Sequence, residues 1–236
     1  MVTPFFLVLS LLQELPCRAE AARQVESALA RGQAFDLIGA ANAYFAAASS
    51  GCAEAAVPGH YLRGLVAAGA AHAQFGTRES LAPVRDAIAV IDARGGTAPG
   101  LPQVARVVLQ AAMAAAQSER PEMALLLEHA VRLEGLQLDA RQPALPVVTA
   151  HEAAGDLWLL VRDYDNAQRA YRRAEERIGT TPRVTLGLAR TADKLNDAVN
   201  ACRQFRALVR WWDRRPGEPP EIADARAYLA RPACAG

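Results

Sequence analysis

The strongest constraint on the fold of this chain is a helical periodicity that occurs twice between residues 150 and 178. Small or apolar residues recur at the i, i+3, i+4 and i+7 spacing of one helix face, first over 150–161 and again over 167–178. A short polar break at 162–165 separates the two stretches. Gly179, followed by Pro182, is typical of a helix end. The pattern predicts two helices of about three to four turns each that form an antiparallel hairpin.

The same pattern returns further along the chain, at a constant offset that carries position 167 onto position 201. Among the aligned pairs a small residue matches a small one, an aromatic residue matches an aromatic one, two further pairs are apolar in both copies, and the proline recurs. The pairs are Ala167 with Ala201, Tyr171 with Phe205, Ala174 with Leu208, Ile178 with Trp212, and Pro182 with Pro216. Because one hairpin cannot bury its apolar face alone, a repeat of this kind predicts hairpins that stack on one another.

On these residues, and on this offset, the chain resembles the tetratricopeptide repeat family, most clearly over 147–216. The family's small, aromatic, alanine, aromatic and alanine positions are occupied by Gly155, Trp158, Ala167, Tyr171 and Ala174. The second copy departs from the family pattern, since Ala189 replaces the glycine and Ala192 the first aromatic residue. The resemblance implies an all-α, right-handed solenoid of stacked antiparallel helical hairpins. The alternative is an ordinary helical bundle in which the repeat is a coincidence.

The rest of the chain is alanine-rich and poor in β-branched runs, which favours helices and predicts no strands. We expect a single repeat domain over 22–236, with degenerate hairpins over 22–140 and a capping helix over 219–231. The expected hairpins pair 19–31 with 33–49 around a hinge at Gly32, 61–74 with 79–94 around Gly76, and 101–118 with 121–135.

Residues 4–12 form a short apolar run that is too short to span a membrane as a helix. A small-x-small motif at 19–21 follows it, and together they predict a signal peptide over 1–21 and a periplasmic or secreted protein. The mature chain is then expected to have no membrane span. No lysine or arginine precedes the run. The alternative is therefore a cytoplasmic protein whose N-terminal helix docks on the first repeat.

The chain has four cysteines, of which Cys17 would be removed by cleavage after residue 21; the others are Cys52, Cys202 and Cys234. Cys202 lies on the apolar stripe of its expected helix, which favours a buried thiol. In an oxidising compartment, a disulfide between Cys202 and Cys234 could instead join the cap to the last repeat.

No sequence motif indicates catalysis or cofactor binding. The four histidines form no i, i+4 pair, and neither HExxH, CxxCH nor GxSxG occurs. The glycine-rich stretch 94–100 lacks the lysine and the preceding strand of a phosphate-binding loop. We therefore expect that the protein is not an enzyme and that it has no metal site and no cofactor. The net charge of +1 provides no overall field that would attract nucleic acid.

In tetratricopeptide repeats, ligands are contacted by the first helix of each hairpin. The resemblance therefore implies that one repeat directs Thr149, Glu152, Asp156 and Leu159 inward, and that the next directs Arg183, Leu186, Arg190, Asp193 and Lys194 inward. The family's carboxylate clamp uses asparagine and lysine at such positions, and here only Lys194 and the arginines could take that role. Residues 162–215 contain 13 basic and 7 acidic side chains. This excess favours an acidic protein or peptide partner, although the basic residues could equally form a solvated outer face.

Together these features predict a non-enzymatic scaffold that binds a protein or peptide on the concave face of the solenoid. The alternative is a structural or accessory subunit whose repeats mediate homo-oligomerisation within an envelope or enzyme assembly.

Overall fold

The computed structural model describes residues 19–94, 100–139, 148–213, 215 and 217–234. In these ranges it contains eleven α-helices, two short 3-10 helices and no strand, which confirms the all-α prediction. These residues group into two compact units, one of 19–32 and 36–150, the other of 33–35 and from 151 onward. The expected signal peptide lies largely outside the described residues, since helix α2 begins at Ala19.

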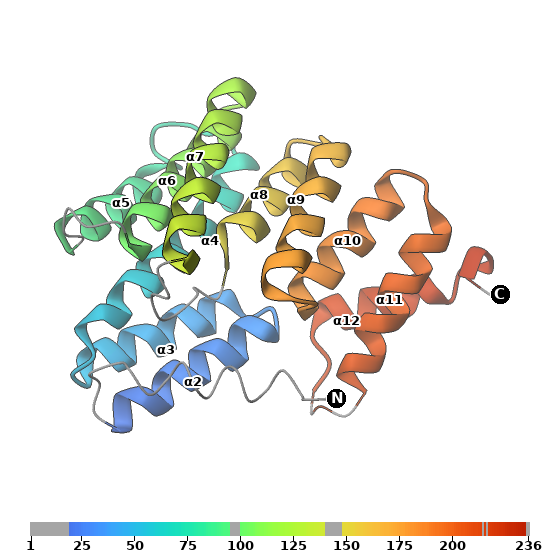
Figure 1. Cartoon of the computed structure of the whole chain (residues 1–236), viewed down its shortest axis with the longest axis horizontal. Helices are drawn as coiled ribbons and strands as arrows, with labels where there is room; N and C mark the ends of the chain where they lie inside the picture. The colour runs from blue at the N-terminus through green and yellow to red at the C-terminus, as the bar shows by residue number, and fades with distance from the viewer. Residues whose placement is uncertain (1–18, 95–99, 140–147, 214, 216, 235–236) are drawn as a thin grey trace. The chain divides into compact units, whose positions relative to one another are not determined.

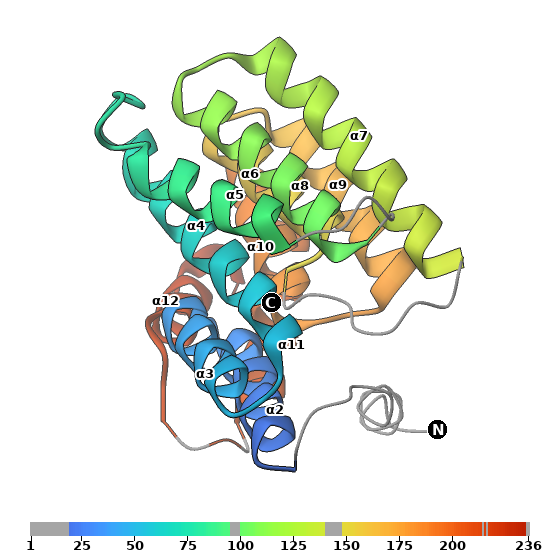
Figure 2. The same cartoon turned by 90° about the vertical axis from the view of Figure 1, so that its left-hand side faces the viewer.

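The first unit is built from six α-helices and one 3-10 helix that follow one another in the chain. They are α2 (Ala19–Gln33), α3 (Leu37–Ser49), η2 (Ala53–Ala55), α4 (Ala56–His72), α5 (Ala82–Arg94), α6 (Leu101–Ala116) and α7 (Arg120–Asp139). Helix α4 packs against α3, α5 and α6, and α6 also packs against α5 and α7 (Figure 2). As its almost wholly apolar sequence predicts, α6 is buried on several sides, from Val104 to Ala116.

The second unit contains the two hairpins that the repeat predicts, followed by the cap. Its elements are α8 (Ala150–Leu160), α9 (Tyr164–Ile178), α10 (Pro182–Lys194), α11 (Ala198–Trp212), α12 (Pro220–Leu229) and η3 (Pro232–Cys234). From α9 to α12, each helix packs against the next (Figure 1). The first and last residues of α11 are those that the sequence alignment pairs with the first and last residues of α9, so the second helix of each hairpin keeps the predicted register. The expected capping helix is α12, and it packs on α11.

The two helices of every hairpin are joined by the same kind of turn. A backbone N–H bonds to the carbonyl five residues earlier at 2.8–2.9 Å. The residue just before that N–H has a φ of 57–66°. This is the Schellman arrangement that ends many helices, usually with glycine at the left-handed position. Here that position is occupied by Phe35, Phe75, Ser118, Arg162 and Asn196.

These turns correct two expected boundaries. The sequence predicts the hinge of the first hairpin at Gly32, but Gly32 is buried inside α2 and the turn is formed at Phe35. The side chain of Asp36 then caps α3 by accepting a hydrogen bond from the N–H of Gly39 at 2.8 Å. The second helix of the third hairpin is expected to end at Gly135, but α7 continues to Asp139.

The core of the second unit depends on a close approach of helices to one aromatic ring. Tyr171 of α9 lies against Gly155 of α8 and Gly187 of α10, and a Cβ atom added at these glycines would lie 2.5 and 2.3 Å from its ring. The equivalent aromatic residue one repeat later, Phe205, packs instead on Tyr228 of the cap, with ring centroids 4.6 Å apart. Tyr171 and Phe205 occupy equivalent positions in the two repeats but pack against different neighbours.

Candidate functional site

Three of the expected site residues meet between α8 and α10. Arg183 donates a hydrogen bond from Nη2 to Oδ2 of Asp156 at 2.9 Å, and its Nε lies 3.9 Å from Oε1 of Glu152. The hydroxyl of Tyr171 donates to the other oxygen of Asp156, Oδ1, at 2.5 Å. Arg183 is 12 % exposed and Glu152 3 % exposed, whereas Asp156 is half exposed. These side chains form an internal network, which we call the α8–α10 cluster.

The polar and charged groups of the α8–α10 cluster interact with one another. Burial, and then the neighbouring Asp156 carboxylate, raise the pKa of Tyr171, so its hydroxyl remains protonated and keeps donating. Glu152 and Asp156 together supply two negative charges beside the one guanidinium of Arg183. Hydrogen bonds to charged groups are the stronger ones, so Arg183 is engaged within the fold.

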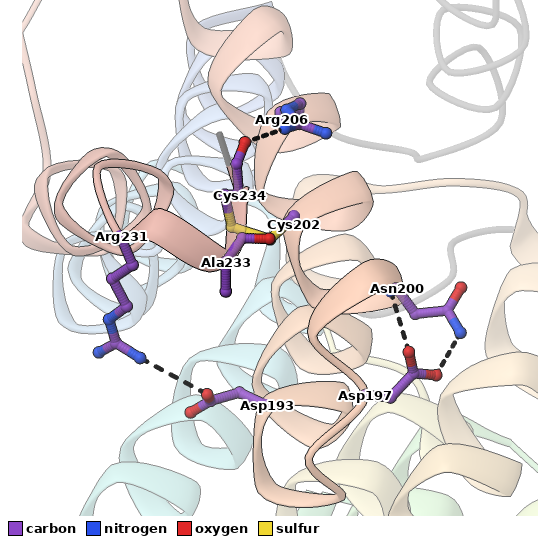
Figure 3. Close-up of a disulfide and its surroundings, with 8 residues drawn as sticks. All are labelled: Asp193, Asp197, Asn200, Cys202, Arg206, Arg231, Ala233 and Cys234. Atoms are coloured by element: carbon purple, nitrogen blue, oxygen red, sulfur yellow. Dashed lines mark hydrogen bonds and ion pairs between the residues drawn. A yellow bond between two sulfur atoms is a disulfide. The ribbon is translucent and has the colours of Figure 1, made fainter. Parts of the chain in front are cut away.

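Asp193, also expected at the site, faces the C-terminal segment. Its Oδ1 lies 3.7 Å from Nη1 of Arg231 (Figure 3). The guanidinium of Arg231 also lies 4.2 Å above the ring of Tyr228. The same segment is fastened to α11 by a disulfide between Cys202 and Cys234, whose Cα atoms are 5.5 Å apart. Arg206 of α11 also donates to the carbonyl of Cys234.

The disulfide decides between the two interpretations of Cys202. The prediction of a buried free thiol is wrong, and the bridge to Cys234 is present across 32 residues of sequence. Cys52 is disulfide-bonded as well. Disulfides persist in oxidising compartments, so both bonds are consistent with the expected localisation outside the cytoplasm.

Arg190 and Lys194 remain exposed on α10. Within the described ranges, neither side chain makes a hydrogen bond or an ion pair. They are four residues apart, so they project from the same helix face. Of the six charged residues expected to face inward, these two are therefore the ones that the fold leaves open to a partner.

The two repeats also share a polar motif, which is missed when only their apolar positions are aligned. Asp163 caps α9 by accepting from the N–H of Asn166 at 3.2 Å, and Asn166 accepts from Arg169 at 2.8 Å. The same chain of bonds recurs at the equivalent positions of the next repeat, in α11, through Asp197, Asn200 and Arg203. The recurrence of Asp-x-x-Asn-x-x-Arg is visible in the sequence.

Helix α9 also displays a row of exposed arginines at spacings of four: Arg169, Arg173 and Arg177. His151, in the N-terminal part of α8, lies close enough to Arg173 and Arg177 for their charges to affect its pKa. Burial, and then Arg173 and Arg177, lower the pKa of His151 to about 4, so this histidine is neutral at physiological pH.

The described residues offer little else for chemistry. They contain no group of three or more histidine, cysteine, aspartate or glutamate side chains that could hold a metal ion. A shallow pocket lies beside the link from α11 to α12, lined by Trp212, Asp213, Arg215, Gly217, Glu218 and Arg226. None of the described helices is long and apolar enough to cross a membrane.

Comparison of the chain with protein-family models, with curated proteins and with solved structures gives no match.

Proposed function

We propose that the chain is a tetratricopeptide-like, right-handed solenoid that acts as a non-enzymatic scaffold for a protein or peptide. The observation that carries this proposal is the recurrence of helix bounds, turn and cap together at one constant offset. Helices α9 and α11 share their length, the left-handed residue before them and the aspartate that caps them. Repeats of this length build extended surfaces, and such surfaces are used for binding.

The partner surface in this proposal is the exposed side of α10. Arg190 and Lys194 supply the cationic groups, and the α8–α10 cluster of Glu152, Asp156 and Arg183 holds the helix that presents them. Asp193 lies next to Lys194 and is engaged by Arg231. An acidic partner fits this surface, because exposed guanidinium and ammonium groups pair with carboxylates.

The test is cross-linking and co-purification from the native host, with the wild-type chain compared with Arg190→Glu combined with Lys194→Glu. The charge-reversed chain should keep its helical circular dichroism, because both positions are exposed. It should also lose the partner that the wild-type chain retains at low salt. Retention of the same partner by both chains would contradict the α10 surface.

A structural or accessory subunit is the second candidate function. Two leucines of α7, Leu125 and Leu136, are 69 % and 61 % exposed, and burial of such apolar side chains is favourable. Association of the chain with itself would cover them. Light scattering over a range of concentrations distinguishes a self-assembling chain from a monomer that needs another protein.

We also propose a periplasmic or secreted location, with the signal peptide at 1–21 as the means of export. The Cys202–Cys234 disulfide supports it. A cytoplasmic protein would meet reducing conditions in which such bonds are rare.

A further inference from the structure

The arginine row of α9 is defined as Arg169, Arg173 and Arg177. Successive members are four residues apart, so they rise by about 6 Å per step along the helix axis. All three side chains are exposed. The residues that α9 buries lie on another face of the helix: Ala167, Ala170, Tyr171 and Ala174.

The positive charge of the arginine row is only partly balanced within the described part of the chain. None of its three guanidinium groups forms an ion pair there, and Arg169 donates only to the neutral side-chain oxygen of Asn166. The nearby Glu175 is engaged by Arg172 at 3.1 Å. Two other carboxylates are exposed on α9, Asp165 before the row and Glu176 beside its end. Three cations therefore face two anions on this surface.

The next repeat keeps one position of the row, since Arg203 matches Arg169 while Ala207 and Trp211 stand at the positions of Arg173 and Arg177. Arg203 of α11 is held by Asn200 as Arg169 is held by Asn166. Arg210 stands where α9 has Glu176, so α11 replaces one of the two anions by a further exposed cation. The outer helices of both hairpins thus carry exposed arginines, whereas the arginine between α8 and α10 is already paired.

Arginine is suited to carboxylates because its planar fork can donate two parallel hydrogen bonds to both oxygens. We propose that the arginine row docks an acidic segment of a partner protein whose carboxylates recur about every 6 Å. Glutamates at i, i+4 and i+8 of a helix meet that spacing. The inference rests on the proposed protein-binding function. It adds a contact on α9, the second helix of one hairpin, to the surface proposed on α10, the first helix of the next hairpin.

The row can be tested with a defined probe. Two helical peptides of identical composition are titrated into the full chain, one with glutamates at i, i+4 and i+8 and one with the same glutamates adjacent at one end. His151 is the reporter, because Arg173 and Arg177 act on its charge. Binding of carboxylates to these arginines should raise the pKa of His151 measured by NMR, while binding on α10 should leave it unchanged.

The matched variants remove the same charge from two helices. Arg173→Gln with Arg177→Gln should weaken binding of the spaced peptide at least about fivefold, and Arg190→Gln with Lys194→Gln less than about twofold, a difference that a titration resolves easily. Circular dichroism of both variants should match the wild type, because all four positions are exposed.

Five results would contradict the proposal that the arginine row docks an acidic segment. Equal losses in the two variants would show a diffuse charge effect, and a loss only at Arg190 and Lys194 would leave the α10 surface as the site. Absence of binding up to about 1 mM peptide, or equal affinity for the two peptides, would remove the spacing argument. Tighter binding to vesicles that contain phosphatidylglycerol than to the spaced peptide would replace a protein partner by a membrane. The outcome of the co-purification experiment, which tests the proposed function, is independent of these results.

Discussion

Gly187 lies in the middle of α10, where the lack of a side chain makes room for the ring of Tyr171. Glycine inside a helix usually costs about 0.5–1 kcal/mol relative to alanine, so a replacement by alanine is normally favourable. At Gly187, however, the new Cβ would lie 2.3 Å from the ring of Tyr171. The absence of a side chain at this position therefore allows α10 to approach α9.

We predict that Gly187→Ala lowers the free energy of unfolding by about 1–3 kcal/mol, because the ring must move out of its packed position. Gly69→Ala is the matched control, since this glycine is also helical and a Cβ there would meet nothing within 4 Å. It should be neutral or stabilise the chain by up to about 1 kcal/mol. Urea unfolding of both variants gives the comparison, and equal effects would contradict the close approach.

His151 makes stability depend on pH in a defined window. Its folded pKa of about 4 lies below the ordinary value of 6.5, so between these values the unfolded chain binds more protons than the folded one. The contribution of neutral His151 is fully present above pH 6.5 and is lost as the pH falls toward 4.

Between pH 7 and pH 4.5 we therefore expect the wild type to lose about 2–3 kcal/mol more stability than His151→Gln, whose side chain does not titrate. Urea midpoints at the two pH values measure this difference. The comparison with the variant removes the effect of carboxylates, which titrate in the same range. Parallel pH profiles for the two chains would show that His151 is not buried in its neutral form.

The candidate site is only partly predictable at this scale. The spacing places Glu152 and Asp156 on one face of α8 and Arg183 at the start of α10, and the structure joins these three. Their pairing with one another depends on the distance between two helices, which no spacing along a single helix contains. The engagement of Asp193 by Arg231 likewise requires the return of the C-terminal segment, and the sequence pattern does not specify that return.

At the scale of elements, helices are more predictable than the turns between them. The 3.6-residue period can be read directly, so the sequence locates α9, α10, α11 and the cap within a few residues. The turns are less visible because the usual signal, glycine at the left-handed position, is missing from the Schellman turns within the five hairpins. The hinge expected at Gly32 illustrates the error, since the glycine lies inside α2 and Phe35 makes the turn.

Phe75 permits a test of these turns. It has a φ of 57° and is 91 % exposed, so its side chain gains little from burial while its backbone occupies a region unfavourable to bulky residues. We expect Phe75→Gly to stabilise the chain by about 0.5–1 kcal/mol, a gain reduced by the greater freedom of glycine in the unfolded state. Phe75→Ala keeps the Cβ and should give no such gain. Thermal unfolding distinguishes the two, and a loss of stability in the glycine variant would contradict the turn.

The cap depends on a covalent bond as well as on packing. Closing a loop of 32 residues should contribute about 3–4 kcal/mol by restricting the unfolded chain. Replacing both Cys202 and Cys234 by serine should therefore lower the free energy of unfolding by this amount. Hydrogen exchange should also become faster in α12, where Tyr228 packs on Phe205. Unchanged exchange in α12 would mean that packing alone holds the cap.

For the molecule as a whole, the disulfides predict where the chain matures. Cys202 and Cys234 are joined by a disulfide, so in protein recovered from an oxidising compartment these two positions should not react with iodoacetamide until the bond is reduced. Mass spectrometry of alkylated peptides gives the answer, and the same data show whether the chain is cleaved near residue 21. An intact N-terminus together with alkylated Cys202 and Cys234 in unreduced protein would favour the cytoplasmic alternative.

The uniform turn between paired helices has a consequence for synthesis. Each hairpin is closed by a bond between residues five positions apart, so it needs no partner from a distant part of the sequence. Chains rich in such local contacts fold quickly, and segments can form in order as they leave the ribosome. The early helices can thus be paired while the later ones are still being translated, which shortens the time for which an alanine-rich chain exposes unpaired apolar faces.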